Sequence, residues 1–136
     1  MAKWLVKSEP FKWSWEDHKK KGVEPWDGVR SAQALNNMRE MKRGDEVMFY
    51  HSNKGLEIVG ICSVVTEFHD DPKDEKSGLV DLKAERDMPR PVTLKEIKAS
   101  GKFEDLALVY QSRLSVMPVS EKHWEAIMAM AKKGAK

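Results

Sequence analysis

Residues 46–68, EVMFYHSNKGLEIVGICSVVTEF, decide the fold. Residues 46–51 and 57–68 are rich in β-branched and aromatic side chains, which favour strands. Asn53-Lys54-Gly55 between them is typical of a tight turn. Two strands joined by so short a turn pair antiparallel. The middle of the second run is apolar on both faces, which predicts a central strand, and Gly60 within it indicates a bulge or bend.

Short elements flank this pair of strands. Before it we expect a strand over residues 4–7, helices over 15–20 and 32–42, and a loop over 23–29. Ser14, with an acidic residue three positions on, has the spacing of a capping box, in which two side chains satisfy the free N–H groups at a helix start.

After it the pattern is similar. We expect a charged loop over residues 69–78 and an alternating strand over 79–86, with a break in regular structure at Pro89 and Pro91. A helix should then run from the capping pair Thr93 and Glu96 to Gly101. After it we expect a helical turn over 103–109, a strand over 110–116 and a last helix capped by Ser120. Residues beyond Lys133 are expected to fray.

Strands outnumber regular strand–helix–strand units, and short helices lie between them. This pattern favours a mixed α+β fold around a curled antiparallel sheet or small barrel, and argues against a doubly wound parallel sheet. A length of 136 residues predicts a single domain spanning residues 1–136.

Charge and cysteine content limit the functions available. The 24 Lys and Arg residues against 22 Asp and Glu give a net charge of +2, too balanced for a protein that coats nucleic acid by charge alone. Cys62 is the single cysteine, so no intramolecular disulfide forms and a reducing compartment is expected. The sequence has no run of membrane-spanning length and no signal-peptide core at its start. We therefore expect no membrane partner and a cytoplasmic location, or a nuclear one in a eukaryotic host.

The segment Trp26-Asp27-Gly28-Val29-Arg30-Ser31 has the composition of a small recognition site. Trp26 offers a π-face for stacking, Gly28 lets a ligand approach the backbone, and Arg30 offers a planar set of donors for phosphate. Alternatively, Trp26 is a core residue and Arg30 braces two loops through a carboxylate.

Lys7-Ser8-Glu9 ends the first expected strand and suits the same task. Glu9 can accept from an exocyclic amine of a base, and Lys7 can bind a phosphate. In the alternative interpretation, Lys7 and Glu9 lie on one strand face and form a surface ion pair.

Residues 49–52 hold side chains that alternate between two faces. Phe49 and His51 share one face, Tyr50 and Ser52 the other, and either pair could face a pocket. A Ser52–His51 nucleophile and base is disfavoured because neighbouring strand residues point to opposite sides. His69-Asp70-Asp71 could hint at a metal, but no second cluster has ligand spacing, so we expect no metal and no cofactor.

Five blocks in order resemble the EVE domain family: WLVKSEP at 4–10, WDGVR at 26–30, MKRGD at 41–45, FYHS at 49–52 and RLSV at 113–116. The resemblance implies a PUA-like fold related to YTH modules, a small β-barrel with flanking helices. It also implies a pocket for one flipped base, a modified cytosine in DNA or a modified base in RNA. The implied base- or nucleic-acid-binding residues are Lys7, Ser8, Glu9, Trp26, Gly28, Val29, Arg30, Ser31, Tyr50, His51, Ser52 and Arg113.

Ser31 departs from the family, which commonly has Asn there. The change alters specificity if this residue touches the base, and is nearly neutral if it only caps a helix. The expected partner is DNA or RNA with modified bases, bound by a monomer that could act with a nuclease or other effector. The alternatives are an enzyme acting on modified nucleotides, and a protein-interaction module that uses Met128 and Met130 of the last helix.

Overall fold

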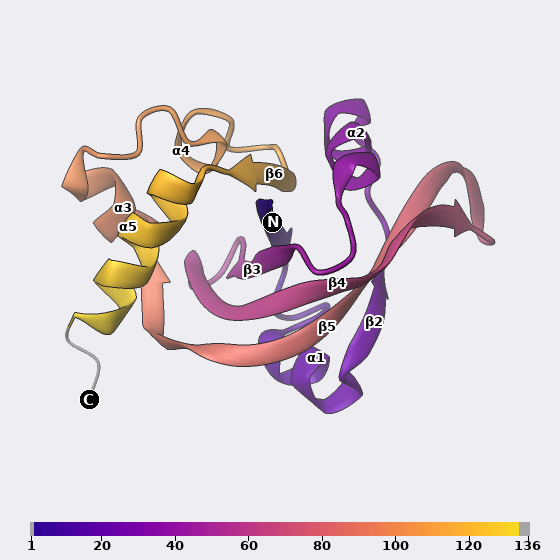
Figure 1. The fold of residues 1–136 in the computed structure, drawn as a ribbon, viewed down its shortest axis with the longest axis horizontal. Helices are drawn as coiled ribbons and strands as arrows, with labels where there is room; N and C mark the ends of the chain where they lie inside the picture. The colour runs from indigo at the N-terminus through magenta and orange to yellow at the C-terminus, as the bar shows by residue number, and fades with distance from the viewer. Residues whose placement is uncertain (1, 134–136) are drawn as a thin grey trace.

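The computed structural model describes residues 2–133, so the expectation for the tail after Lys133 lies outside the described residues. Short helices are interspersed among the strands (Figure 1), in the order β1 Lys3–Ser8, α1 Trp15–Lys21, β2 Val23–Trp26, α2 Ala32–Glu40, β3 Glu46–His51, β4 Glu57–Asp71, β5 Asp74–Thr93, α3 Leu94–Ser100, α4 Ala107–Tyr110, β6 Val116–Val119 and α5 Glu121–Lys132. The predicted mixed α+β class is confirmed.

One sheet joins the strands of residues 2–133, in the order β2-β5-β4-β3-β1-β6. β3 and β4 pair antiparallel, as residues 46–68 predicted. β1 lies between β3, which runs parallel to it, and β6, which runs antiparallel. This arrangement sets Lys7 beside Tyr50 and Ser8 beside His51, so two polar strand ends meet at one place.

The sheet is strongly curled because β4 and β5 bend along their length (Figure 1). The pairing of these two strands shifts register at Gly60, which confirms the bulge expected there. A Cβ atom on Gly60 would lie 2.1 Å from Cε2 of Trp15, so only glycine leaves room for this indole. Within the described residues, β2 and β6 remain as edges, so the sheet is curled but does not close into a ring.

Two segments expected as loops are parts of strands. The loop predicted over residues 23–29 begins with β2, whose Trp26 pairs with Val80. The loop predicted over 69–78 is instead the end of the β4–β5 hairpin, which turns between Asp71 and Asp74. Neither segment shows apolar alternation in the sequence, because Pro25 interrupts β2 and charged residues dominate residues 69–76, so the strand pairing there depends on backbone hydrogen bonds.

The break predicted at Pro89 and Pro91 is also wrong, since β5 continues to Thr93. The partner of Gly60 is Asp87, and the partner of Ile58 is Val92. The prolines therefore fall within a bulge of β5, where the missing N–H groups are not needed for the ladder.

The strand expected over residues 110–116 is mostly a turn. Tyr110 ends α4, the N–H of Leu114 donates to the carbonyl of Gln111, and β6 starts only at Val116. Arg113 therefore lies in this turn and is exposed, not in a strand.

The helix starts follow their capping signals. Capping boxes form at Ser14 and at Thr93, and the hydroxyls of Ser31 and Ser120 accept from the first turns of α2 and α5. α2 ends at Glu40, earlier than expected.

α5 packs on the sheet through the face predicted for it, with Trp124, Ile127 and Ala131 buried and Met128 partly buried. The helices of residues 2–133 are all too short or too polar to cross a membrane.

Candidate functional site

The end of β1 and the segment that begins with the last residue of β2 both line a cavity of about 500 Å³, here called the Trp26 cavity. It brings together six of the predicted residues: Lys7, Ser8, Glu9, Trp26, Gly28 and Val29. Sequence reasoning missed the other lining residues, Lys12, Trp13, Glu24, Pro25, Asp27 and Ser115.

Trp26 is a wall of this cavity and also part of the core. Its side chain is only 7% exposed, and its ring meets Phe49 edge to face at 5.4 Å between centroids. The ring of His18 lies 5.9 Å away on a tilt. The indole is thus held in one orientation by buried neighbours rather than standing free on the surface.

Trp13 provides a second indole and is fixed by His18. Its Nε1–H donates to Nδ1 of His18 at 3.0 Å, and the two rings meet edge to face. Trp13 directly precedes the cap residue Ser14, and His18 is the fourth helical residue, which are the two positions of a hydrophobic staple. This spacing was the available sequence signal for Trp13.

Ser8 and Glu9 leave β1 at the mouth of the cavity. The hydroxyl of Ser8 donates to the carbonyl of Trp13 and keeps its acceptor lone pairs. The carboxylate of Glu9 lies 3.4 Å from Nζ of Lys12. The alternative ion pair of Lys7 with Glu9 is not formed, since Nζ of Lys7 donates instead to the carbonyl of Ser112 at 2.8 Å.

The Trp26 cavity carries acceptors in excess of cations. Glu9, Glu24 and Asp27 supply carboxylates, whereas Lys7 and Lys12 supply the ammonium groups. Such a lining suits a flat ligand that offers N–H donors better than it suits a bare anion.

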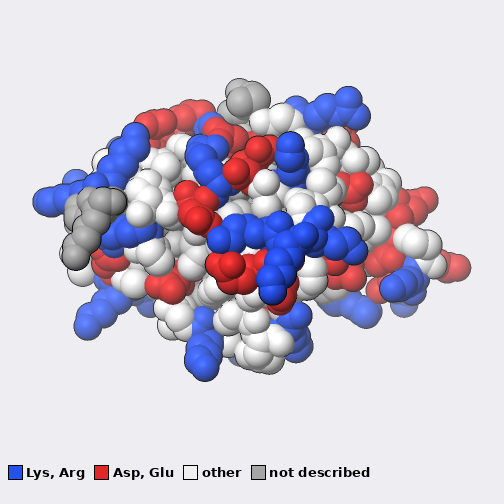
Figure 2. All heavy atoms as spheres, turned by 90° about the horizontal axis from the view of Figure 1, so that it is seen from below, with Lys and Arg blue, Asp and Glu red and all other residues white. Residues whose placement is uncertain are grey.

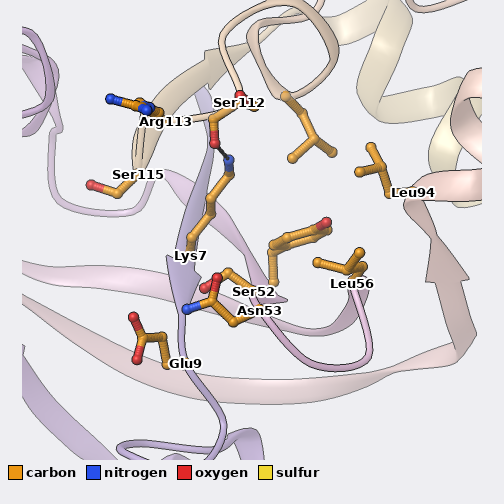
Figure 3. Close-up of a pocket in the computed structure, with 11 residues that line it drawn as sticks. Lys7, Glu9, Ser52, Asn53, Leu56, Leu94, Ser112, Arg113 and Ser115 are labelled. Carbon is orange, nitrogen blue, oxygen red and sulfur yellow. Dashed lines mark hydrogen bonds between the residues drawn. The ribbon is translucent and has the colours of Figure 1, made fainter.

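A second cavity, of about 460 Å³ and here called the Tyr50 cavity, adjoins the first (Figure 3). Lys7, Glu9 and Ser115 line both. The predicted residues Tyr50, Ser52 and Arg113 line the Tyr50 cavity but not the Trp26 cavity, together with the unpredicted Asn53, Leu56, Leu94, Leu108 and Ser112.

The structure shows which pair of side chains in residues 49–52 faces a cavity. Tyr50 and Ser52 face the Tyr50 cavity. His51 points to the other side, where its Nε2 accepts from the backbone N–H of Trp15 at 3.0 Å and its ring packs on Phe49. Ser52 and His51 therefore do not form a nucleophile and base.

Burial shifts the pKa of two groups that line the Tyr50 cavity. It lowers the pKa of Lys7, whose ammonium group lies 5.9 Å from the Tyr50 ring centroid. It raises the pKa of Tyr50 to about 12, so the phenol stays protonated at neutral pH.

Other predicted residues serve the scaffold. Arg30 pairs with Asp74 at 3.2 Å with its side chain 80% exposed, which matches the loop-bracing alternative. Ser31 caps α2 and lines a separate hollow with Arg113. Gly28 has a φ of 73°, and a Cβ there would meet nothing within 4 Å, so its backbone conformation is what favours glycine.

The remaining reactive side chains are engaged or buried. His69 pairs with Asp81 at 3.1 Å, and residues 2–133 contain no group of three or more His, Cys, Asp or Glu that could hold a metal ion. Cys62 is buried, and this burial raises the pKa of its thiol.

The surface does not carry a single sign of charge on the face in Figure 2. Lys and Arg side chains form a short band there, with Asp and Glu side chains beside them. On this face, binding to a polyanion would depend on a local site rather than on a broad positive field.

Comparisons with known proteins agree on one family. The EVE domain model matches residues 2–130. Thymocyte nuclear protein 1 of Danio rerio is 34% identical in an alignment of 165 positions, gaps included, that covers 95% of this chain and 71% of that protein. Protein Atu2648 from Agrobacterium tumefaciens is 49% identical, with a TM-score of 0.93 over 100% of this chain and 98% of that one.

Two further solved structures are complexes with nucleic acid. Human THYN1, in complex with 5-methylcytosine containing DNA, is 29% identical, with a TM-score of 0.88 over 97% of this chain and 98% of that one. The YTH domain of Zygosaccharomyces rouxii MRB1, in complex with N6-methyladenosine RNA, is 14% identical, with a TM-score of 0.60 over 96% of this chain and 84% of that one. The latter likeness concerns the fold alone.

Proposed function

The chain belongs to the EVE domain family, as its five sequence blocks indicated, and from this premise we propose that it is a nucleic-acid-binding module whose Trp26 cavity accepts one flipped base. A modified cytosine in DNA is the first candidate ligand, and a modified base in RNA is the second. The observation that carries the proposal is the convergence of Lys7-Ser8-Glu9 with Trp26 and Gly28 on one cavity of about 500 Å³. This volume lies in the range of small-molecule sites, about 300–1,000 Å³.

The walls suit the three parts of such a base. The indoles of Trp13 and Trp26 offer apolar surface to the ring and to a methyl group, and base–aromatic stacking contributes about 1–3 kcal/mol. Glu9 is the acceptor proposed for the exocyclic amine of cytosine. The ammonium group of Lys7, which donates to the neutral carbonyl of Ser112, can serve a carbonyl oxygen or a phosphate.

The comparison with human THYN1 supports the choice of ligand, because that relative was solved with 5-methylcytosine containing DNA and overlaps 97% of this chain. We propose binding without catalysis, by a monomer that delivers modified nucleic acid to an effector such as a nuclease. The buried, reduced thiol of Cys62 is compatible with a cytoplasmic or nuclear location.

The test is a panel of single- and double-stranded DNA and RNA oligonucleotides with plain or modified cytosine or adenine, measured by fluorescence anisotropy. We expect saturable binding that is tightest for one modified base. Trp26→Phe should weaken binding about three- to tenfold, because the smaller ring keeps only part of the stacking energy. Glu9→Gln should reduce the preference for cytosine over adenine, because the new amide offers donors as well as an acceptor.

Trp124→Phe is the matched control. Trp124 is 3% exposed on α5 and lines neither cavity, so its replacement has a similar effect on the core without touching the ligand. Equal affinity of Trp26→Phe and Trp124→Phe for every oligonucleotide would remove Trp26 from the site. Equal affinity of the parent for plain and modified bases would remove the specificity for modification.

A further inference from the structure

The Tyr50 cavity has two chemically different sides. In Figure 3, Arg113, Ser115 and Glu9 lie on one side of Lys7, and Leu56 and Leu94 lie on the other. A polar side with cations beside an apolar side is the division that a nucleotide presents, with its phosphate at one end and its base at the other.

Among residues 2–133, no carboxylate forms an ion pair with Lys7 or Arg113 of this cavity. The ammonium group of Lys7 donates to the carbonyl of Ser112, and Arg113 forms no ion pair with any residue that the structure describes. The one carboxylate in the lining, Glu9, lies beside Lys12. Here the cations outnumber the carboxylates, the reverse of the Trp26 cavity, so a phosphate fits the Tyr50 cavity better.

The loop at its mouth is held in an unusual backbone conformation. Asn53, Gly55 and Leu56 have φ angles of 67°, 90° and 47°. Positive φ is uncommon for leucine and unfavourable by about 1–2 kcal/mol. Within this loop the N–H of Lys54 donates to the carbonyl of Ser52 at 2.8 Å, and the N–H of Leu94 donates to the carbonyl of Leu56 at 2.9 Å. The Leu56 side chain is 43% exposed in this conformation and lines the cavity.

We propose that the Tyr50 cavity is a second subsite that binds the nucleotide next to the flipped base, with its phosphate between Lys7 and Arg113 and its base against Leu56. This inference rests on the proposed function of the Trp26 cavity. Lys7, Glu9 and Ser115 line both cavities, so neighbouring nucleotides of one strand can occupy them together. Apolar side chains that insert between base steps are a known means by which proteins stabilise distorted duplex DNA.

The test compares a mononucleotide with dinucleotides. The ligands are 5-methyldeoxycytidine monophosphate and the two dinucleotides that add thymidine on its 5′ or its 3′ side, titrated by calorimetry. The parent should bind one dinucleotide about five- to tenfold more tightly than the mononucleotide. Leu56→Asn should abolish this gain while mononucleotide affinity stays unchanged. Arg113→Gln should reduce dinucleotide affinity by a similar factor.

Leu56→Asn separates a binding role from a structural one, because asparagine tolerates positive φ and the folded state should keep its thermal stability. Arg39→Gln is the matched charge control, since exposed Arg39 bonds to Asn36 and lines neither cavity. In NMR spectra, the amide signals of Asn53 and Leu56 should move with the dinucleotide and not with the mononucleotide.

Two outcomes overturn the inference in different ways. If Trp26→Phe weakens both ligands while Leu56→Asn and Arg113→Gln bind the dinucleotides like the parent, the second subsite is refuted and the base cavity stands. If the parent binds none of the three ligands and no oligonucleotide of the wider panel, the proposed function fails and the second subsite fails with it.

Discussion

Nε1 of Trp13 lies 3.0 Å from Nδ1 of His18, and this contact fixes the protonation state of the histidine. An indole N–H only donates, so Nδ1 must accept. The other nitrogen, Nε2, lies 2.9 Å from the carbonyl of Leu82 and must carry the proton. His18 is therefore a neutral imidazole, fully buried, that holds one indole of the Trp26 cavity in place.

Stability should fall as the pH is lowered through the ordinary range of histidine. Burial lowers the pKa of folded His18 below its ordinary value, so the unfolded chain takes up a proton first. The contribution to the free energy of unfolding is complete above about pH 6.5 and declines below it. We expect urea unfolding between pH 7.5 and 5.5 to show this decline, in a window where the carboxylates remain ionised.

Replacing the histidines tests which residues cause this pH dependence of stability. Burial also lowers the pKa of His51, so both residues contribute in the same direction. His18→Gln should be less stable at pH 7.5 yet show a shallower decline, and the double variant with His51→Gln a shallower decline still. An unchanged slope in the double variant would contradict the assignment.

Gly60 should tolerate no larger residue. Because a Cβ would lie 2.1 Å from Cε2 of buried Trp15, Gly60→Ala must displace the indole or the strand, at about 3 kcal/mol. Gly101→Ala is the matched control, since its new Cβ meets nothing within 4 Å and only its φ of 69° is unfavourable, by about 1 kcal/mol. Chemical unfolding measures both, and equal losses would rule out the contact with Trp15.

Ser31→Asn should leave stability and base preference nearly unchanged. Ser31 accepts from the N–H of Ala34 as the cap of α2, and it does not line the Trp26 cavity. Serine and asparagine cap helices about equally well, whereas Ser31→Ala should lower the free energy of unfolding by about 1 kcal/mol. A change in base preference on Ser31→Asn would instead place this position in contact with the ligand.

The local features of the fold could be predicted because they depend on neighbours in sequence. The antiparallel pair within residues 46–68 and the capping boxes at Ser14 and Thr93 are of this kind. The prolines of β5 and the short strand β2 were missed, because a bulge and an edge strand depend on the partner strand rather than on the segment itself.

The candidate site was predictable only in part, for the same reason. Lys7 and Trp26 carry their chemistry in short motifs, and the structure places both on one cavity. Lys7 lies beside Tyr50 because β1 and β3 pair in a parallel register. No local sequence pattern predicts this register. Arg30 and Arg113 have the same chemistry in the sequence, and only the tertiary structure pairs one with Asp74 and leaves the other at a cavity.

This difference between the two arginines should appear in the salt dependence of binding. On a single strand, each phosphate contact contributes about 0.7 to the slope of log affinity against log salt concentration. Arg113→Gln should therefore reduce the magnitude of the slope by about 0.7 and weaken all sequences alike. Arg30→Gln should leave the slope nearly unchanged, because its guanidinium is paired with Asp74 at 3.2 Å and lines neither cavity. Oligonucleotide titrations of both variants between about 50 and 200 mM salt measure the two slopes, because counterion release changes affinity strongly over this range. The opposite result, with the slope reduced by Arg30→Gln alone, would move the phosphate contact from the turn before β6 to the loop after β2.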